Sequence, residues 1–294
     1  MAAERAMPAF GTWDGHCHSG FARHGGGGAT DAFAGRALAL GFTRVTFTEH
    51  PVFPTGILAP AVHEGIYLDG ADLARYVRDT ERVRDAFAGR LEVRVGFEID
   101  YVPGMPDFPL TYLGPLGDRV EDAVLSLHYV PGPGGRLVGL DIDPDEVVAE
   151  LVPYYGGVDA LRRAYWEMLE EAIERACGWG LAVPRRLSHL DVVGRFRDRL
   201  PVADPARDRE AAARVLDRAA ATGFAIEVNA KGLELPLRRE AHPAAELLAD
   251  AVARGLPLVY GSDAHASADV GWHRDALVAQ VAAARARAGA AGAG

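Results

Sequence analysis

Apolar residues along the chain form two alternating kinds of pattern. Short runs rich in Val, Ile, Leu and Phe recur through the sequence, and each ends on a polar residue. Runs that are apolar throughout are typical of strands buried on both faces. The pattern therefore predicts seven buried strands, at residues 12–18, 43–50, 92–100, 123–129, 185–191, 223–230 and 256–265.

Helical patterns lie between most of these runs. In the clearest one, Leu161, Tyr165 and Leu169 fall four residues apart and share one apolar stripe, with charged residues opposite. Alternating strands and helices favour parallel strands joined by right-handed crossovers. We predict a single α/β barrel of seven strands, with helices at residues 31–40, 69–88, 159–177, 207–221, 244–254 and 273–288.

The length of 294 residues and the hydrophobic content of 49% suffice for one barrel with a substantial core. No repeat or convincing linker divides the chain, so residues 1–294 are expected to form one domain. The two ends, residues 1–9 and 284–294, are expected to be loose.

Charge and cysteine usage narrow the possible partners and location. A formal net charge of −10 opposes binding to nucleic acid. The first ten residues lack the features of a signal peptide, and no stretch is long and apolar enough for a membrane span. We expect a soluble, cytoplasmic protein with no nucleic-acid or membrane partner, in which Cys17 and Cys177 are reduced thiols. The sequence does not specify the oligomeric state.

Histidines and acids gather where the predicted strands end. The carboxyl ends of barrel strands converge on one mouth, and imidazole and carboxylate groups suit Zn, Mn or Fe. The sequence therefore predicts a multinuclear metal site. The residues at these ends, with one in the first loop, are His16, His18, His24, His50, Glu98, His128, His189, Asn229, Asp263 and His265.

The two-residue period of a strand predicts which neighbours face the site. His16 and His18 point to one side and Cys17 to the other, so Cys17 is interpreted as packing in the barrel wall. By the same alternation, Glu49 points away from His50 and is not expected to be a ligand.

The motifs "HCH", "TEH", "GFEID", "SLHY", "SHLD", "EVNAKGL" and "GSDAH" occur in order between residues 12 and 271. This set resembles the polymerase-and-histidinol-phosphatase (PHP) superfamily, and within it the histidinol-phosphate phosphatases. The resemblance implies a distorted (β/α)7 TIM-like barrel with three divalent ions, either Zn, Mn or Fe. It also implies three ligand groups: His16, His18, Glu98 and Asp263; Glu98, His128 and His189; His24, His50 and His265.

The activity implied by the resemblance is hydrolysis of a small phosphate monoester, L-histidinol phosphate, by a metal-bridged hydroxide, as a step of histidine biosynthesis. Asp263 or His265 would orient the water or protonate the leaving alkoxide. Arg163 and Arg195 would bind phosphate, with Arg162 replacing Arg163 if the register differs by one. Asn229 would face the mouth as a supporting or substrate-binding donor.

Two positions depart from the pattern of the resembled family. Ser188 precedes His189 where glycine is usual, and Lys231 stands where a small hydroxyl residue is commoner, either adding a cation near the pocket or pointing outward. His63, His242 and His273 are expected at the surface. Two alternatives remain: a PHP phosphoesterase acting on another ester, such as a nucleotide or cyclic phosphate, and a non-catalytic metal-binding domain.

Overall fold

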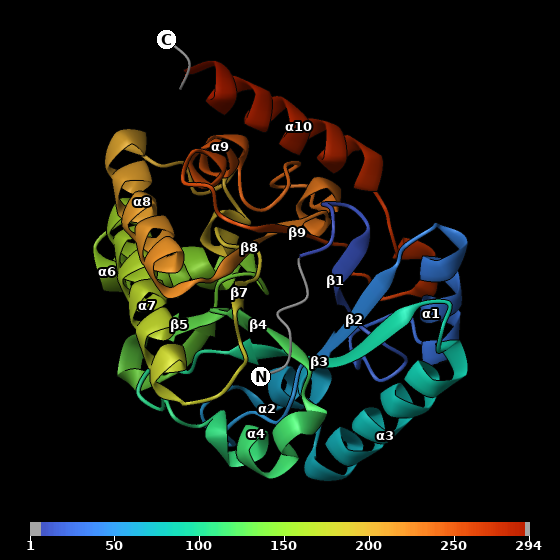
Figure 1. The fold of residues 1–294 in the computed structure, drawn as a ribbon. Helices are drawn as coiled ribbons and strands as arrows, with labels where there is room; N and C mark the ends of the chain where they lie inside the picture. Colours follow the sequence, from blue (N-terminus) through green and yellow to red (C-terminus); the bar gives the residue numbers. More distant parts are fainter. Residues whose placement is uncertain (1–6, 292–294) are drawn as a thin grey trace.

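A computed structural model describes residues 7–291, which form a closed barrel of seven parallel strands in the order β1-β2-β3-β4-β7-β8-β9 (Figure 1). All seven predicted strands are confirmed, although the fifth is short. The barrel strands are β1 (Trp13–Cys17), β2 (Arg44–Glu49), β3 (Glu92–Asp100), β4 (Asp122–Ser126), β7 (Arg186–Leu187), β8 (Ala225–Asn229) and β9 (Leu258–Gly261).

The six predicted helices surround this barrel (Figure 1). They are α1 (Thr30–Ala39), α3 (Gly70–Phe87), α7 (Val158–Gly178), α8 (Pro205–Thr222), α9 (Ala245–Ala253) and α10 (Arg274–Ala291). Local chemistry sets their ends. The Asp69 carboxylate accepts hydrogen bonds from the first amides of α3, and Asp204 does the same for α8. Gly223 ends α8 with a φ of 75°, a conformation that glycine adopts without strain.

Several short elements were not predicted, because they are too short to establish a period. A hairpin of β5 (Tyr129–Pro131) and β6 (Leu137–Gly139) turns through the sequence "PGPGG" at residues 131–135. The others are α2 (Pro60–Ile66), α4 (Leu110–Leu116), α5 (Pro144–Glu146), α6 (Val152–Tyr155), the π-helical turn η3 (Val147–Leu151), and the 3₁₀ turns η1 (Gly117–Arg119), η2 (Pro133–Gly135), η4 (Val192–Gly194), η5 (Lys231–Glu234) and η6 (Ser267–Asp269).

The predicted loose ends need one correction. Residues 284–291 continue α10, which therefore runs past the predicted end at 288. This segment is rich in alanine, the residue that most favours helix. Residues 7–9 belong to no helix or strand, whereas residues 1–6 and 292–294 lie outside the described part of the chain.

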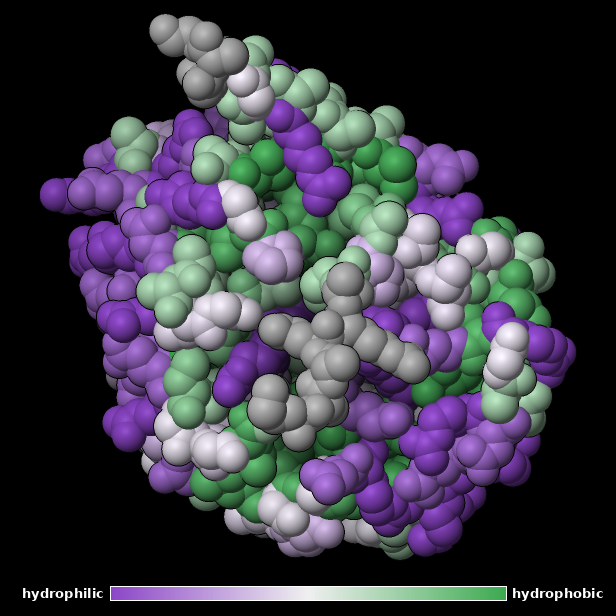
Figure 2. All heavy atoms as spheres, in the orientation of Figure 1, coloured by the Kyte–Doolittle hydropathy of each residue, from purple (hydrophilic) through white to green (hydrophobic). Residues whose placement is uncertain are grey.

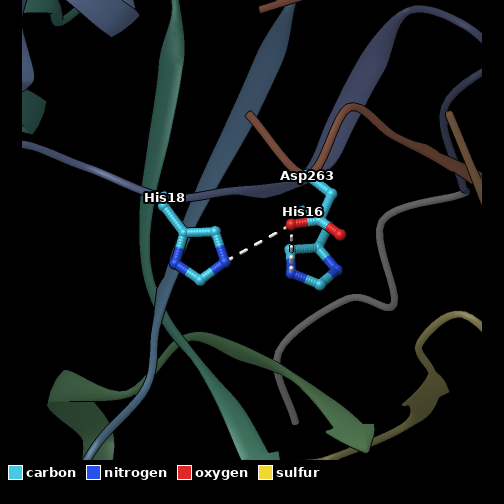
Figure 3. A group of neighbouring side chains, drawn as sticks. All are labelled: His16, His18 and Asp263. Atoms are coloured by element: carbon cyan, nitrogen blue, oxygen red, sulfur yellow. Dashed lines mark ion pairs between the residues drawn. The ribbon is translucent and has the colours of Figure 1, made fainter. Parts of the chain in front are cut away.

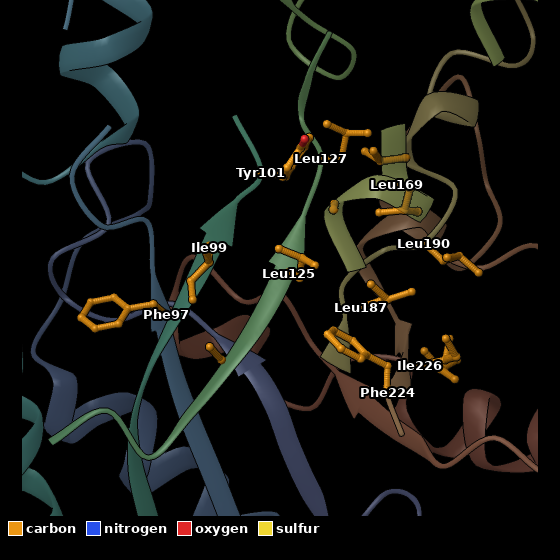
Figure 4. Packing of buried hydrophobic residues seen from close by; sticks show 14 of the residues in the cluster. Phe97, Ile99, Tyr101, Leu125, Leu127, Leu169, Leu187, Leu190, Phe224 and Ile226 are labelled. Atoms are coloured by element: carbon orange, nitrogen blue, oxygen red, sulfur yellow. The ribbon is translucent and has the colours of Figure 1, made fainter. Parts of the chain in front are cut away.

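The main core lies between the barrel wall and the helices. Alternate strand residues such as Phe97, Ile99 and Leu125 are fully buried in this cluster (Figure 4). The alternation of strand side chains places Glu98, between Phe97 and Ile99, on the other face. Leu169 of α7 belongs to the same cluster. Because the apolar side chains occupy the outer face, the inner face is free to carry polar groups.

A buried polar layer fills the amino end of the barrel. Arg186 Nη2 lies 3.1 Å from Asp122 Oδ2, and the same carboxylate oxygen accepts a 2.9 Å hydrogen bond from Thr46. Trp13 donates to the Thr46 hydroxyl, and the Arg186 guanidinium lies 4.8 Å from the centre of the Trp13 ring. This layer links β2, β4 and β7 near their amino ends, whereas the predicted site residues lie at the carboxyl ends of the strands.

Hydrophilic side chains dominate the rim of the face seen in Figure 2, over α3 at lower right and over α7 and α8 at left. Among residues 7–291, no helix combines the length and apolar character needed to cross a bilayer.

Candidate metal centre

The predicted ligand residues meet at the carboxyl end of the barrel, around Glu98 of β3. Glu98 Oε2 lies 3.1 Å from His16 Nε2, 3.5 Å from His18 Nε2 and 3.3 Å from His50 Nε2. Its other oxygen, Oε1, lies 2.7 Å from His189 Nε2 and 3.4 Å from His128 Nε2. One buried carboxylate therefore stands between two sets of imidazole nitrogens.

Asp263 closes one side of this cluster. It follows β9 with a φ of 54°, and its amide donates a 2.7 Å hydrogen bond to the His16 carbonyl. Its Oδ1 lies 3.5 Å from His18 Nε2 and 3.8 Å from His16 Nε2, so the three side chains converge on a common point (Figure 3). A bulge in β1 between Asp14 and Cys17 lies beside this point, and Cys17 is buried in the outer core as predicted.

His24 and His265 form the outer edge of the cluster. Their Nε2 atoms lie 2.6 Å apart, so the two imidazoles face each other directly. His265 Nδ1 donates to the Asp263 carbonyl over 2.9 Å, which directs its Nε2 toward His24. The His50 ring lies 5.4 Å from that of His24, while His50 Nε2 faces Glu98. His50 thus connects the outer pair to the centre.

Three further carboxylates orient the imidazoles from behind. Glu227 Oε1 lies 2.9 Å from His16 Nδ1, Asp100 Oδ1 lies 2.6 Å from His128 Nδ1, and Glu49 Oε2 lies 3.3 Å from His18 Nδ1. Each contact leaves the Nε2 atom directed at the cluster, which is how carboxylates commonly support metal-binding histidines.

Glu49 is excluded from the centre, as alternation predicts, and accepts hydrogen bonds from the amide and hydroxyl of Ser19. The supporting roles of Asp100 and Glu227 were missed. A signal existed for both, because each stands two residues from a predicted site residue in the same strand and so faces the same side.

The charge balance of the cluster favours bound cations. Burial opposes protonation of His16, yet Glu227, Glu98 and Asp263 raise its pKa well above the ordinary value. Likewise, burial lowers the pKa of His18, but Asp263, Glu49 and Glu98 raise it overall. Among residues 7–291, the buried Nε2 atom of His18 has no hydrogen-bond partner. A divalent metal ion can take the place of a proton at an imidazole nitrogen beside excess buried carboxylate, so these residues fit the implied metals.

A cavity of about 690 Å³ opens directly onto the cluster. Beside the imidazoles, its charged lining includes Asp141, Arg195, Lys231 and Asp269. Asn229 does not line this cavity. It is fully buried and its Nδ2 donates to Asp263 Oδ2 over 3.2 Å, so it supports the carboxylate of a predicted ligand and does not face the cavity.

Arg163 lies away from the cavity, contrary to the expectation for it. It is exposed on α7 and lines a separate surface hollow with Asp159 and Arg207. Its neighbour Arg162 does not replace it, because that guanidinium makes hydrogen bonds of 2.9 and 2.6 Å to the Asp208 carboxylate of α8. This face of α7 turns toward α8 and not toward the barrel mouth.

The expectation that His242 lies at the surface is wrong. It is buried, lines the cavity and places its ring 6.0 Å from that of His189. Its Nδ1 lies 2.8 Å from Asp191 Oδ1, and Arg238 holds the same carboxylate. Burial and the Arg238 charge lower the pKa of His242 to about 4. No neighbouring motif signalled this isolated histidine in the sequence.

The other two histidines expected at the surface are partly exposed. His63 Nε2 donates to the Phe53 carbonyl over 3.0 Å, and His273 contacts Glu234. Ser188 is accommodated within the site, since its hydroxyl lies 2.5 Å from that of Ser126, which donates to Glu98 Oε1. The added side chain thus extends the hydrogen bonding of the central carboxylate.

The sequence of this chain is similar to a known domain family and to two named proteins. The family model of the PHP domain matches residues 14–231. The histidinol-phosphatase of Bacillus subtilis (strain 168) is 28% identical over 265 residues, covering 90% of this chain and 97% of that protein. A Deinococcus radiodurans protein named "Probable histidinol-phosphatase" is 32% identical over 266 residues, covering 89% of each chain.

Two solved structures share the fold. A Listeria monocytogenes protein, hisK, assigned as a histidinol phosphatase, superposes with a TM-score of 0.83 and 26% identity, covering 90% of this chain and 99% of that one. The histidinol phosphate phosphatase of Lactococcus lactis subsp. lactis, solved with zinc, L-histidinol and phosphate, has a TM-score of 0.68 and 17% identity, covering 94% of each chain.

Proposed function

Because the chain belongs to the PHP domain family, we propose that it is a metal-dependent phosphoric monoester hydrolase that converts L-histidinol phosphate to L-histidinol and phosphate. The observation that carries this proposal is the convergence of imidazole and carboxylate side chains on Glu98 in the lining of a cavity of about 690 Å³. The relatives named for this reaction resemble the chain over nine-tenths of its length and so support the choice of substrate.

Three divalent ions are proposed, with Glu98 shared between two of them. The first would be held by His16, His18, Glu98 and Asp263, and the second by Glu98, His128 and His189. The third would be held by His24 and His265 together with His50, whose Nε2 also faces Glu98. Zn, Mn and Fe all suit these ligands. Such ions, when bound, lower the pKa of water and neutralise charge on a phosphoryl group.

The chain's own groups would orient the reactants. Asn229 and the His16 carbonyl fix Asp263, whose carboxylate would accept a hydrogen bond from the attacking water. His265 lies at the open edge of the cluster and would face the leaving oxygen, with its ring held by the Asp263 carbonyl. Arg195 lines the cavity with no acidic partner among the described residues, and its planar guanidinium suits the outer phosphoryl oxygens.

The cavity also suits the amine of the proposed substrate. Asp141 lines it near His128 and Tyr129, and no hydrogen bond or ion pair to a described residue engages its carboxylate. A carboxylate that lines the same cavity without a partner among the described residues would pair with the ammonium group of histidinol phosphate. This carboxylate distinguishes the proposed substrate from esters that carry no cation.

The test is turnover by metal-replete protein combined with elemental analysis. We expect phosphate release from L-histidinol phosphate with a higher kcat/KM than from nucleotides or cyclic phosphates, and about three metal ions per chain. Asp263→Ala should abolish turnover. Efficient hydrolysis of another monoester without hydrolysis of L-histidinol phosphate would reject the substrate and keep the chemistry. Metal binding with no hydrolysis of any ester would instead favour a non-catalytic domain.

A further inference from the structure

Lys231 is the only lysine among the 31 basic residues of the sequence, and it lines the cavity above the metal ligands. It follows β8 at the start of η5, and its backbone amide donates a 2.8 Å hydrogen bond to Asn229 Oδ1. Asn229 in turn contacts Asp263. The backbone of Lys231 is therefore fixed to the same network that holds a proposed ligand.

A tryptophan directs the Lys231 side chain. Its Nζ lies 5.2 Å from the ring centre of Trp272, within the range of a cation–π interaction. Trp272 is itself fixed, because its Nε1 donates to the Ser262 carbonyl over 2.6 Å and its carbonyl accepts from the Tyr260 hydroxyl over 2.7 Å. The ammonium group thus lies beside a ring whose own position is fixed.

The ammonium group of Lys231 forms no ion pair with a described acidic residue. Within the part of the chain that the structure describes, no carboxylate forms an ion pair or hydrogen bond with its Nζ. Buried arginines differ in this respect: Arg162, Arg186 and Arg238 are paired with Asp208, Asp122 and Asp191. The cavity therefore keeps two uncommitted cations, Arg195 and Lys231.

These two cations reach the cavity from different strand ends. Arg195 follows β7 and the turn η4, whereas Lys231 follows β8, the strand paired with β7, and its charge acts on Asp263 and His265 after β9. Two positive groups that line one cavity from two different strand ends match the several outer oxygens of a phosphoryl group.

We propose that Lys231 is a phosphate-binding residue that contacts an outer phosphoryl oxygen of the substrate and of the product phosphate from the Asp263–His265 side. This rests on the proposed function only to the extent that the substrate is a phosphate monoester. The resembled pattern has a small hydroxyl residue here, so the ammonium adds charge at a position where a neutral donor is usual. Its flexible stem lets the point charge follow the phosphoryl group as the P–O bond breaks.

The first test measures chemical modification of Lys231, which can be followed by itself because the sequence contains one lysine. Metal-replete protein is treated with trinitrobenzenesulfonate in phosphate-free buffer, with and without inorganic phosphate, and peptides are mapped by mass spectrometry. Phosphate should slow modification of Lys231 by about tenfold. The bound anion would keep the ammonium group protonated and shield it from the reagent. The α-amino group of the same chain serves as the internal control and should react at an unchanged rate.

The second test measures competitive inhibition by inorganic phosphate. Lys231→Met keeps the length of the stem and removes the charge, so the inhibition constant of phosphate and the KM of the best ester should each rise about tenfold, with a smaller change in kcat. Lys231→Arg should retain most of the affinity. Arg78→Met removes an exposed cation on α3 and should change neither constant.

An unprotected Lys231 peptide, or Lys231→Met with unchanged phosphate inhibition, would overturn the assignment. Both measurements use inorganic phosphate, the product of any phosphomonoesterase. If the wild-type protein hydrolyses a different ester, the proposed function fails while these two tests remain decisive for Lys231.

Discussion

The imidazoles of the centre owe their orientation to carboxylates that never face the cavity. Asp100, Glu227 and Glu49 each contact the Nδ1 atom of a histidine whose Nε2 points at Glu98. A carboxylate at this position fixes the tautomer and the ring plane of the imidazole, and strengthens its binding to a metal.

Glu227→Gln should therefore weaken metal binding without removing a ligand. The amide lacks the charge that favours a proton on His16 Nδ1, so we expect metal affinity to fall about 10- to 100-fold. Titration of metal-free protein with Zn would measure this change. Unaltered affinity in Glu227→Gln would contradict a supporting role for the carboxylate.

The two candidate arginines should behave differently when replaced. Arg195 lines the cavity with no acidic partner, whereas Arg163 is exposed on α7. We expect Arg195→Ala to raise the KM for the phosphate ester about tenfold or more, because a charged hydrogen bond is lost. Arg163→Ala should leave the KM unchanged, and a large increase with this variant would show that the helix approaches substrate.

Asp141 offers a test of substrate identity. Asp141→Asn should raise the KM for L-histidinol phosphate by about tenfold, since the ammonium group would lose its counter-charge. The KM for an ester without a cation, such as p-nitrophenyl phosphate, should not rise. Equal effects on both esters would mean that Asp141 does not recognise the amine.

At the scale of the elements, a buried ion pair joins two barrel strands near their amino ends, away from the proposed metal centre. Arg186 of β7 and Asp122 of β4 are almost wholly buried, and Thr46 of β2 binds the same carboxylate. The pair links strands that otherwise share few ladder hydrogen bonds, because β7 has only two residues.

Removing one partner should destabilise the barrel strongly. Arg186→Met leaves the Asp122 carboxylate buried and uncompensated, and we expect the free energy of unfolding to fall by about 3–5 kcal/mol. The exposed pair of Arg209 and Asp250 is the matched control, since Arg209→Met should cost less than about 1 kcal/mol. Urea denaturation would separate the two. Similar losses for both variants would contradict the role assigned to burial.

At the scale of the whole molecule, the cluster draws residues from along most of the chain, from His16 in β1 to His265 after β9. Any ion bound there connects strands on opposite sides of the barrel. Metal binding is therefore expected to stabilise the complete fold and not a single loop.

Chelation should lower both activity and thermal stability. A ligand present at 100 to 1,000 times its dissociation constant contributes about 3–4 kcal/mol, so metal removal should reduce the Tm by several degrees. Adding Zn or Mn should restore both properties. Asp263→Ala lacks a proposed ligand, and its Tm should respond less to the chelator. Hydrolysis that persists after complete metal removal would reject a metal-dependent mechanism.

The sequence alone determined the barrel and most of its centre for one physical reason. Buried parallel strands appear as continuous apolar runs, and a polar residue that ends such a run must lie at the shared mouth. His50, Glu98 and Asp263 were placed by this rule without any knowledge of their neighbours. The supporting carboxylates Asp100 and Glu227 carried the same signal in their two-residue spacing.

Tertiary structure decided the residues that strand ends do not fix. The direction in which Arg163 points depends on how α7 packs against α8, and an amphipathic pattern cannot distinguish one charged position from the next. His242 lies in a loop that Arg238 and Asp191 draw against His189. Periodicity reports on contacts repeated along an element, whereas these contacts are made once, between segments far apart in sequence, and only the packed chain specifies them.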